Sequence, residues 1–153
     1  MEYREVEYAD IPSLTRIRAQ GGDTEEYWTW RITGYLNQEL HPHRALMPRV
    51  MYVATDGDTI AGFIAGHLSE RFGYDGELQW IDVLPEYKRK GIASRLLYML
   101  AKWFADQNVH RVCVNVGGEE GRKFYFRHEA KQMNEYWMTW EDVGVVLKNE
   151  TII

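Results

Sequence analysis

The chain has 153 residues, of which 45% are hydrophobic and 27% charged, and its formal net charge at pH 7 is −5. These values are typical of one soluble globular domain spanning 1–153, and the acidic balance argues against nucleic acid as the main partner. The charged N-terminal segment and the lack of an apolar run approaching ~18 residues predict a cytoplasmic protein without a membrane partner. The single cysteine, Cys113, fits a reducing compartment and is expected to be an inert thiol in a buried strand.

The hydrophobic pattern predicts alternating strands and helices along the chain. The expected elements are, in order, a strand (2–8), a helix from Asp10, a helix (24–40), a loop (41–48), strands (50–54, 60–68 and 77–83), a helix from Gly91 to about Asn108, a strand (111–116), a short helix (119–128) and a strand (131–141). The unit 77–116 should be a right-handed parallel βαβ, and the hairpins around it antiparallel. The fold class is therefore α/β with a mixed sheet (α+β in character), and the dinucleotide fingerprint and the P-loop motif are both missing.

The stretch from Val83 to Leu97 is the most informative part of the sequence. An apolar segment passes through a Pro-marked turn and the basic loop Lys88-Arg89-Lys90 to Gly91, where an amphipathic helix begins. Free backbone N–H groups and the positive end of a helix dipole together favour an anion. Because the loop is basic on an acidic chain, it indicates a phosphate-bearing ligand, although a solvated surface turn would have the same composition.

With these residues in view, the chain resembles the GNAT superfamily of acetyl-CoA-dependent N-acetyltransferases. The family pattern [Gln/Arg]-x-x-Gly-x-[Gly/Ala] lies between a strand and a helix, and here it stands as Lys88-Arg-Lys-Gly91-Ile-Ala93, with Lys in place of Gln or Arg. The resemblance implies a GNAT-like acyl-CoA N-acyltransferase fold, with a central mixed sheet of about six to seven strands flanked by helices.

A second family pattern, Asn-x-x-Ala-x-x-[apolar]-Tyr followed by Gly-Phe, is only partly kept. The chain has Gly118-Glu-Glu-Gly121-Arg-Lys-Phe124-Tyr125 and then Glu129-Ala130. The Tyr and its apolar predecessor match, whereas Gly replaces both Asn and Ala. Because that Asn usually helps to hold the cofactor arm, the contacts near Gly118 differ from those of the family.

The resemblance implies acetyl-CoA as donor substrate and no metal. The backbone of the strand end would hold the pantetheine arm and the thioester carbonyl, and the loop and first helical turn would hold the pyrophosphate. The implied cofactor-binding residues are Ile81, Asp82, Val83, Lys88, Arg89, Lys90, Gly91, Ile92, Ala93, Ser94, Gly118 and Tyr125.

Two catalytic residues follow from the same resemblance. Tyr125 would be the general acid that protonates the departing thiolate, and Glu77 would be the general base, directly or through water. Asp82 and His67 are the second and third candidates for the base. By strict alternation Glu77 shares a face with Ile81 and Val83, while Asp82 points to the opposite face. The structural alternatives are an aromatic that packs the last helix and an exposed carboxylate at a strand end.

Aromatic residues mark the expected acceptor pocket. Trp28, Trp30, Tyr27 and Tyr35 lie in the segment that forms one pocket wall in the family; Trp28 fits a buried helical stripe, so Trp30 is the better pocket candidate. Trp137 and Trp140 would close the other wall or pack the sheet. Aromatic faces bind cations, and an acidic chain also suits a cationic acceptor.

The predicted function is N-acetyltransfer from acetyl-CoA to a primary amine, on a small molecule or a peptide, by direct attack in a ternary complex. The alternatives are a CoA-binding or regulatory module of the same fold that has lost the chemistry, and transfer of another acyl group. The family resemblance allows a homodimer. His41 and His43 have no suitably spaced partner, so no metal site is expected.

Overall fold

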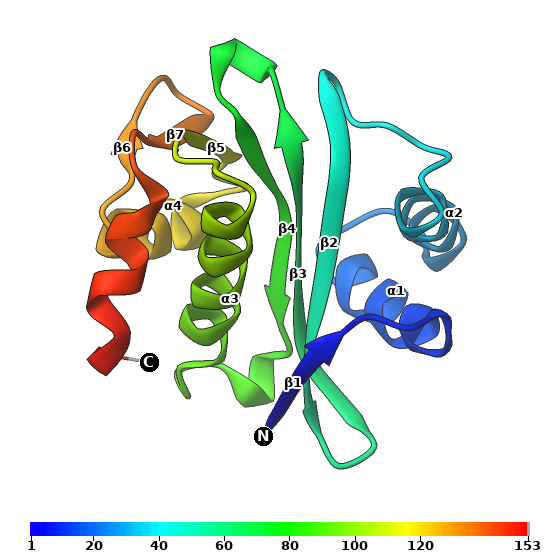
Figure 1. Cartoon of the computed structure of the whole chain (residues 1–153). Coiled ribbons are helices and arrows are strands. Elements are labelled where there is room, and N and C mark those ends of the chain that lie inside the picture. Colours follow the sequence, from blue (N-terminus) through cyan, green and yellow to red (C-terminus); the bar gives the residue numbers. More distant parts are fainter. Residues whose placement is uncertain (153) are drawn as a thin grey trace.

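The computed structural model describes residues 1–152, with side chains up to Lys148, and shows a seven-stranded sheet with helices on both faces (Figure 1). The strand order is β1-β2-β3-β4-β5-β7-β6, and only the β4–β5 pair is parallel. The strands are β1 (Glu2–Glu5), β2 (Ala45–Asp56), β3 (Thr59–Ser69), β4 (Gly76–Val83), β5 (Val112–Asn115), β6 (Lys131–Gln132) and β7 (Trp137–Trp140). The predicted mixed-sheet α/β class is confirmed.

Four α-helices and four 3₁₀ segments complete the described chain. The helices are α1 (Ile11–Ala19), α2 (Glu25–Leu36), α3 (Ile92–Asp106) and α4 (Glu119–Arg127), and the 3₁₀ segments are Tyr8–Asp10, Arg71–Gly73, Pro85–Tyr87 and Val143–Ile152. Within residues 1–152, no helix is long and apolar enough to cross a membrane.

The sheet separates two apolar clusters. On one face α1 and α2 cover Met51, Phe63 and Trp80, and on the other α3 packs with the C-terminal 3₁₀ segment over Ile64 and Leu78 (Figure 1). The stripe predicted for α3 is buried: Ile92, Leu96, Leu97, Leu100 and Phe104 are each at most 3% exposed. Burial of this apolar stripe holds α3 against β4, so the start of the helix stays beside the end of the strand.

Several boundaries differ from the sequence-based expectations. The first strand, expected over 2–8, ends at Glu5, and a 3₁₀ segment follows at Tyr8–Asp10. The segment 131–141 forms two short strands, because the Asn134 side chain accepts hydrogen bonds from the N–H groups of Tyr136 and Trp137 and makes a turn. Helix α2 ends at Leu36, where Gln38 takes a left-handed conformation (φ 63°). Strand β2 begins inside the predicted loop, at Ala45, and pairs with Ser69 before a shift in register.

Candidate active site

The parallel strands β4 and β5 separate after a short paired stretch. Their register covers Gly76, Glu77 and Leu78 of β4, whereas β4 itself continues to Val83. On its other side β4 stays paired with β3, and the Leu84 N–H donates to the Ala61 carbonyl. Hydrogen bonding alternates along an antiparallel pair, so the backbone groups of Ile81 and Val83 face away from β3. They face the slot that opens between β4 and β5.

A bulge in β4 changes which side chains share a face. Two consecutive β3 residues pair with Leu78 and Trp80, so Gln79 is an extra residue. Trp80 consequently packs with the α1–α2 cluster, and Asp82 forms an ion pair with Arg18 of α1 at 2.9 Å. The expectation that Glu77 and Asp82 lie on opposite faces is therefore wrong.

Both carboxylates are found on the α1–α2 side, while Ile81 and Val83 pack with the α3 cluster. Side chains of a regular strand alternate between the two faces of the sheet. The extra residue Gln79 shifts this alternation by one position, so every side chain after it lies on the face opposite to the expected one.

The loop between β4 and α3 has the features of an anion site. Gly91 adopts a left-handed conformation (φ 81°) before the helix, and Arg95 makes the first helical hydrogen bond to the Gly91 carbonyl. The N–H groups of residues 92–94 precede that bond and have no partner inside the helix. Among the described residues, no backbone hydrogen bond is donated by residues 89–91 either. Six consecutive N–H groups are thus available to a ligand, beside two exposed basic side chains, Arg89 and Lys90.

Two predicted ligand residues of this region have protein partners. The Lys88 ammonium group lies 2.9 Å from Glu120 in the first turn of α4, which brings the start of α4 next to the loop. The Ser94 hydroxyl lies 3.0 Å from Nε2 of His128, a buried side chain at the end of α4. The Ser94 side chain therefore joins α3 to α4, and its contact with phosphate stays a prediction.

The two glycines that depart from the family pattern have local structural causes. Gly118 has φ 152° and ψ −176°, a conformation that essentially only glycine adopts. A Cβ at Gly121 would lie 2.0 Å from the Val116 carbonyl oxygen, so an alanine does not fit while α4 sits this close to β5. The substitutions follow from the packing of α4 and are not by themselves a sign of lost chemistry.

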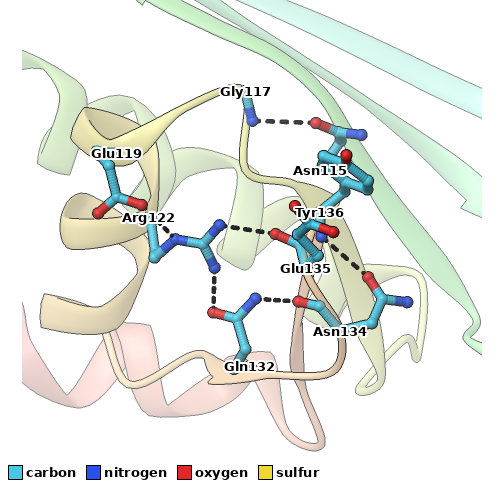
Figure 2. Close-up of polar contacts among 8 residues, drawn as sticks. All are labelled: Asn115, Gly117, Glu119, Arg122, Gln132, Asn134, Glu135 and Tyr136. Atoms are coloured by element: carbon cyan, nitrogen blue, oxygen red, sulfur yellow. Dashed lines mark hydrogen bonds and ion pairs between the residues drawn. The ribbon is translucent and has the colours of Figure 1, made fainter.

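Helix α4 is held in place by a polar network around Arg122 (Figure 2). The Arg122 guanidinium group donates to Glu119, to the Gln132 side chain and to the Glu135 carbonyl, and Gln132 donates to the Asn134 carbonyl. These contacts tie the first turns of α4 to the β6–β7 turn. They orient the helix that carries Tyr125.

Tyr125 is 4% exposed and packs edge-to-face on Trp140 of β7, with ring centroids 6.0 Å apart. Burial raises the pKa of its hydroxyl, and the Asp82 carboxylate raises that pKa further. The Arg18 guanidinium group lowers that pKa in part. A buried phenol with a raised pKa is protonated at neutral pH, the state that a general acid needs.

Glu77 lies in the paired part of β4 and is 4% exposed, so it is not the solvated strand-end carboxylate of the structural alternative. Its Oε1 accepts a hydrogen bond from Arg71 Nε at 2.7 Å and lies 3.8 Å from Nε2 of His67. On the far side of the ring, the Tyr35 hydroxyl lies 2.9 Å from His67 Nδ1. Burial raises the pKa of Glu77 although Arg71 opposes the shift, and burial lowers the pKa of His67 to about 3.

A pocket of about 190 Å³ opens between α2, the loop after it and β4. Its walls include Trp30, Tyr35 and Trp80, with Arg31 and Leu40 beside them. Trp30 is 58% exposed whereas Trp28 is buried, in agreement with the roles expected from the helical stripe. A larger groove of about 460 Å³ on the outer side of α4, lined by Phe126, Arg127 and Gln132, contains none of the predicted site residues.

The aromatic faces in this region are already covered by arginines of the chain itself. The Arg18 guanidinium carbon lies 4.3 Å from the Trp28 ring centroid, and that of Arg49 lies 4.6 Å from Tyr35. The Arg31 guanidinium carbon lies 5.6 Å from both Trp28 and Trp80. The Trp28, Trp80 and Tyr35 rings thus already contact cations of the chain itself, and the cationic acceptor stays a prediction.

Sequence reasoning missed these arginines and Arg71, because an isolated arginine in a helix or loop has no local pattern that reveals its partner. On the other predicted wall, Trp140 is buried and donates to the His128 carbonyl, and Trp137 packs on Phe72. His41 accepts a hydrogen bond from Arg49. Among the described residues, no group of three or more metal-ligating side chains is present. Cys113 is buried in β5, as predicted, and burial raises its pKa to about 12, which disfavours the reactive thiolate.

Several solved structures share this fold. An aminoglycoside 6'-acetyltransferase type Ii has a TM-score of 0.73 at 16% identity, covering 94% of this chain and 97% of that one. An aminoglycoside 6'-N-acetyltransferase complexed with coenzyme A has a TM-score of 0.71 at 16% identity, with 91% and 96% covered. PaiA N-acetyltransferase from Thermoplasma acidophilum, in complex with coenzyme A, has a TM-score of 0.63 at 19% identity, with 91% and 97% covered.

No curated protein sequence matches the chain. The family model described as acetyltransferase (GNAT) family matches residues 17–130, which include β4, the basic loop, α3 and Tyr125. The match covers most of the 153 residues, and the resemblance seen in the loop sequence is confirmed. The chain belongs to the acetyltransferase (GNAT) family.

Proposed function

We propose that residues 1–153 act as one N-acetyltransferase domain that moves an acetyl group from acetyl-CoA to a primary amine. The observation that carries this proposal is the slot beside Ile81 and Val83, which is continuous along the chain with the free N–H groups of the basic loop. A thioester donor with a long arm and a pyrophosphate needs both features within one βαβ unit. The coenzyme A complexes of two structural neighbours are consistent with this use of the fold.

In the proposed reaction the amine nitrogen attacks the thioester carbonyl carbon directly, and the carbon–sulfur bond breaks. Backbone groups of Ile81 and Val83 orient the donor, which makes the attack effectively intramolecular. Tyr125 gives its proton to the departing thiolate. The amine loses a proton to a base on the α1–α2 side of β4.

Glu77 reaches the acceptor pocket through other side chains in this proposal. Tyr35 lines the pocket and is hydrogen bonded to His67, which in turn faces Glu77. If His67 Nδ1 accepts from Tyr35 and the ring proton is on Nε2, a proton relay from the amine through Tyr35 and His67 to Glu77 needs the 3.8 Å gap between Nε2 and Glu77 Oε1 to close when the acceptor binds. Asp82 is the competing base because it lies nearer to Ile81, with its pKa raised by burial although Arg18 opposes the shift.

A thiol-release assay with acetyl-CoA and a panel of amines tests the function. Turnover with at least one amine supports the enzyme, and tight coenzyme A binding without turnover on any amine favours the binding module. Tyr125→Phe should lower kcat by roughly 10²- to 10⁴-fold, because a general acid contributes about that much. Its affinity for coenzyme A should change little; equal loss of both would make Tyr125 a packing residue.

The base is assigned by two matched variants, Glu77→Gln and Asp82→Asn. The variant that removes the base should lose the ascending acid limb of the profile of kcat/KM against pH, whereas the other should keep the limb at a lower or unchanged level. Loss of the limb only in Asp82→Asn would reject the route through Tyr35.

A further inference from the structure

The acceptor pocket has a surplus of positive charge within an acidic protein. Arg31 lines the pocket, and Arg49 contacts the lining residues Tyr35, Leu40 and His41. Two further arginines near β4 are neutralised, Arg18 by Asp82 and Arg71 by Glu77. Within the part of the chain that the structure describes, neither Arg31 nor Arg49 forms an ion pair with a carboxylate. A half-buried cation without a counter-ion attracts an anionic ligand.

The two unpaired arginines have different tasks. Arg49 donates to the carbonyls of Tyr35 and Leu40 and to His41, so its guanidinium group braces the chain after α2. Arg31 lines the pocket, and among the described residues it donates one hydrogen bond, from Nη1 to the Tyr27 hydroxyl. Its Nε and Nη2 donors remain for a ligand. A guanidinium group binds a carboxylate with two parallel hydrogen bonds, the geometry that these free donors suit.

The remaining walls select for an apolar body of small size. Trp30, Trp80 and Leu40 supply apolar surface beside Arg31. The volume of about 190 Å³ is below the roughly 300–1,000 Å³ common for drug-sized ligands, so a single amino-acid-sized molecule fits better than an oligosaccharide. Trp80 is directly followed by Ile81, whose backbone faces the slot, so β4 contributes both to the pocket and to the proposed donor site.

We propose that the acceptor is a small apolar or aromatic amine that also bears a carboxylate, as a free amino acid does. This inference rests on the proposed acetyltransfer. The carboxylate pairs with Arg31, the apolar side chain contacts Trp30 and Leu40, and the amine is directed toward Ile81.

The test compares three acceptors that differ at one group: phenylalanine, phenylalaninamide and phenethylamine, with spermidine as the cationic alternative. Acetylation is measured by thiol release with acetyl-CoA, using the wild-type protein, Arg31→Gln and Arg31→Lys. Arg16→Gln is the control, since Arg16 is an exposed arginine of α1 away from the pocket. Phenylalanine should exceed phenethylamine in kcat/KM by roughly 10- to 100-fold, the value of a charge-assisted hydrogen-bonded pair.

Arg31→Gln should remove that preference by lowering kcat/KM for phenylalanine alone, and Arg31→Lys should restore part of it. A preference for phenethylamine or spermidine, or an equal loss on all acceptors in Arg31→Gln, would overturn the inference.

Binding separates this inference from the proposed function. If no amine is acetylated, tryptophan fluorescence is titrated with phenylalanine and with phenethylamine in the presence of coenzyme A. Tighter binding of phenylalanine that depends on Arg31 supports the carboxylate site although the chemistry has failed, and equal or undetectable binding of both rejects it.

Discussion

At the scale of single residues, the buried imidazole of His67 links stability to pH. The side chain is fully buried and faces Tyr35, Glu77, Arg49 and Arg71, and burial together with the two arginines lowers its pKa from 6.5 to about 3. The unfolded chain therefore takes up a proton below pH 6.5 that the folded chain refuses. The contribution of His67 to the free energy of unfolding is therefore fully present above pH 6.5, and it is lost as the pH falls toward 3.

His67→Gln should therefore flatten the dependence of unfolding free energy on pH below 6.5, because glutamine keeps an acceptor for Tyr35 but does not titrate. The lost slope should approach ~1.4 kcal/mol per pH unit, the value for one proton. Urea unfolding at several pH values measures it, with the exposed His43→Gln as control. An unchanged slope would contradict the neutral state assigned to His67.

Glu77 makes the free energy of unfolding depend on pH in the opposite direction. Its pKa is raised above the ordinary 4.5, so the folded protein holds a proton that the unfolded chain releases, and the contribution is lost as the pH rises above 4.5. Glu77→Gln should therefore steepen the gain in stability with rising pH.

At the scale of secondary-structure elements, the contact between α4 and the end of β5 sets the place of Tyr125. Gly121→Ala tests this contact, because the variant is stabilised if α4 is free to move and destabilised if α4 is held close to β5. In an unhindered helix, Ala is more stable than Gly by about 1 kcal/mol, but here a Cβ would meet the Val116 carbonyl oxygen at 2.0 Å. We expect a net destabilisation of about 1–3 kcal/mol by overpacking, measured by thermal or urea unfolding.

Gly21→Ala is the matched control, since its Cβ would lie 3.6 Å from the nearest atom, at ordinary contact distance. A stabilising Gly121→Ala would mean that α4 is free to move away from β5.

At the scale of the whole molecule, the sheet is joined across a short parallel ladder. β5, β7 and β6 connect to β1–β4 through the register Gly76–Leu78, supported by α3 and the C-terminal 3₁₀ segment. A coenzyme A bound along β4 and the basic loop, next to α4, would contact both parts. Binding should therefore raise stability by RT ln(1 + [L]/Kd), about 2.7 kcal/mol at a hundred times Kd.

Gly91→Leu should reduce the rise in Tm on adding coenzyme A, because a side chain at φ 81° strains the loop and blocks approach of a pyrophosphate. Gly57→Leu is the control: Gly57 also has a positive φ, 61°, but lies in the β2–β3 turn. Both variants should be less stable than the wild-type protein without ligand. Only Gly57→Leu should keep the full rise in Tm when coenzyme A is added. A full shift in Gly91→Leu would reject the loop as the pyrophosphate site.

The sequence by itself determined the features that depend on near neighbours in the chain. The period of α3, the loop from Lys88 to Gly91 and the position of Tyr125 are local patterns, and together they were enough to identify the family. The acceptor side was decided only by the tertiary structure. The bulge at Gln79 moves Asp82 to the face of Glu77, and Arg18 pairs with Asp82 across 64 residues of chain. Such contacts form when distant segments pack against one sheet, so no local pattern records them.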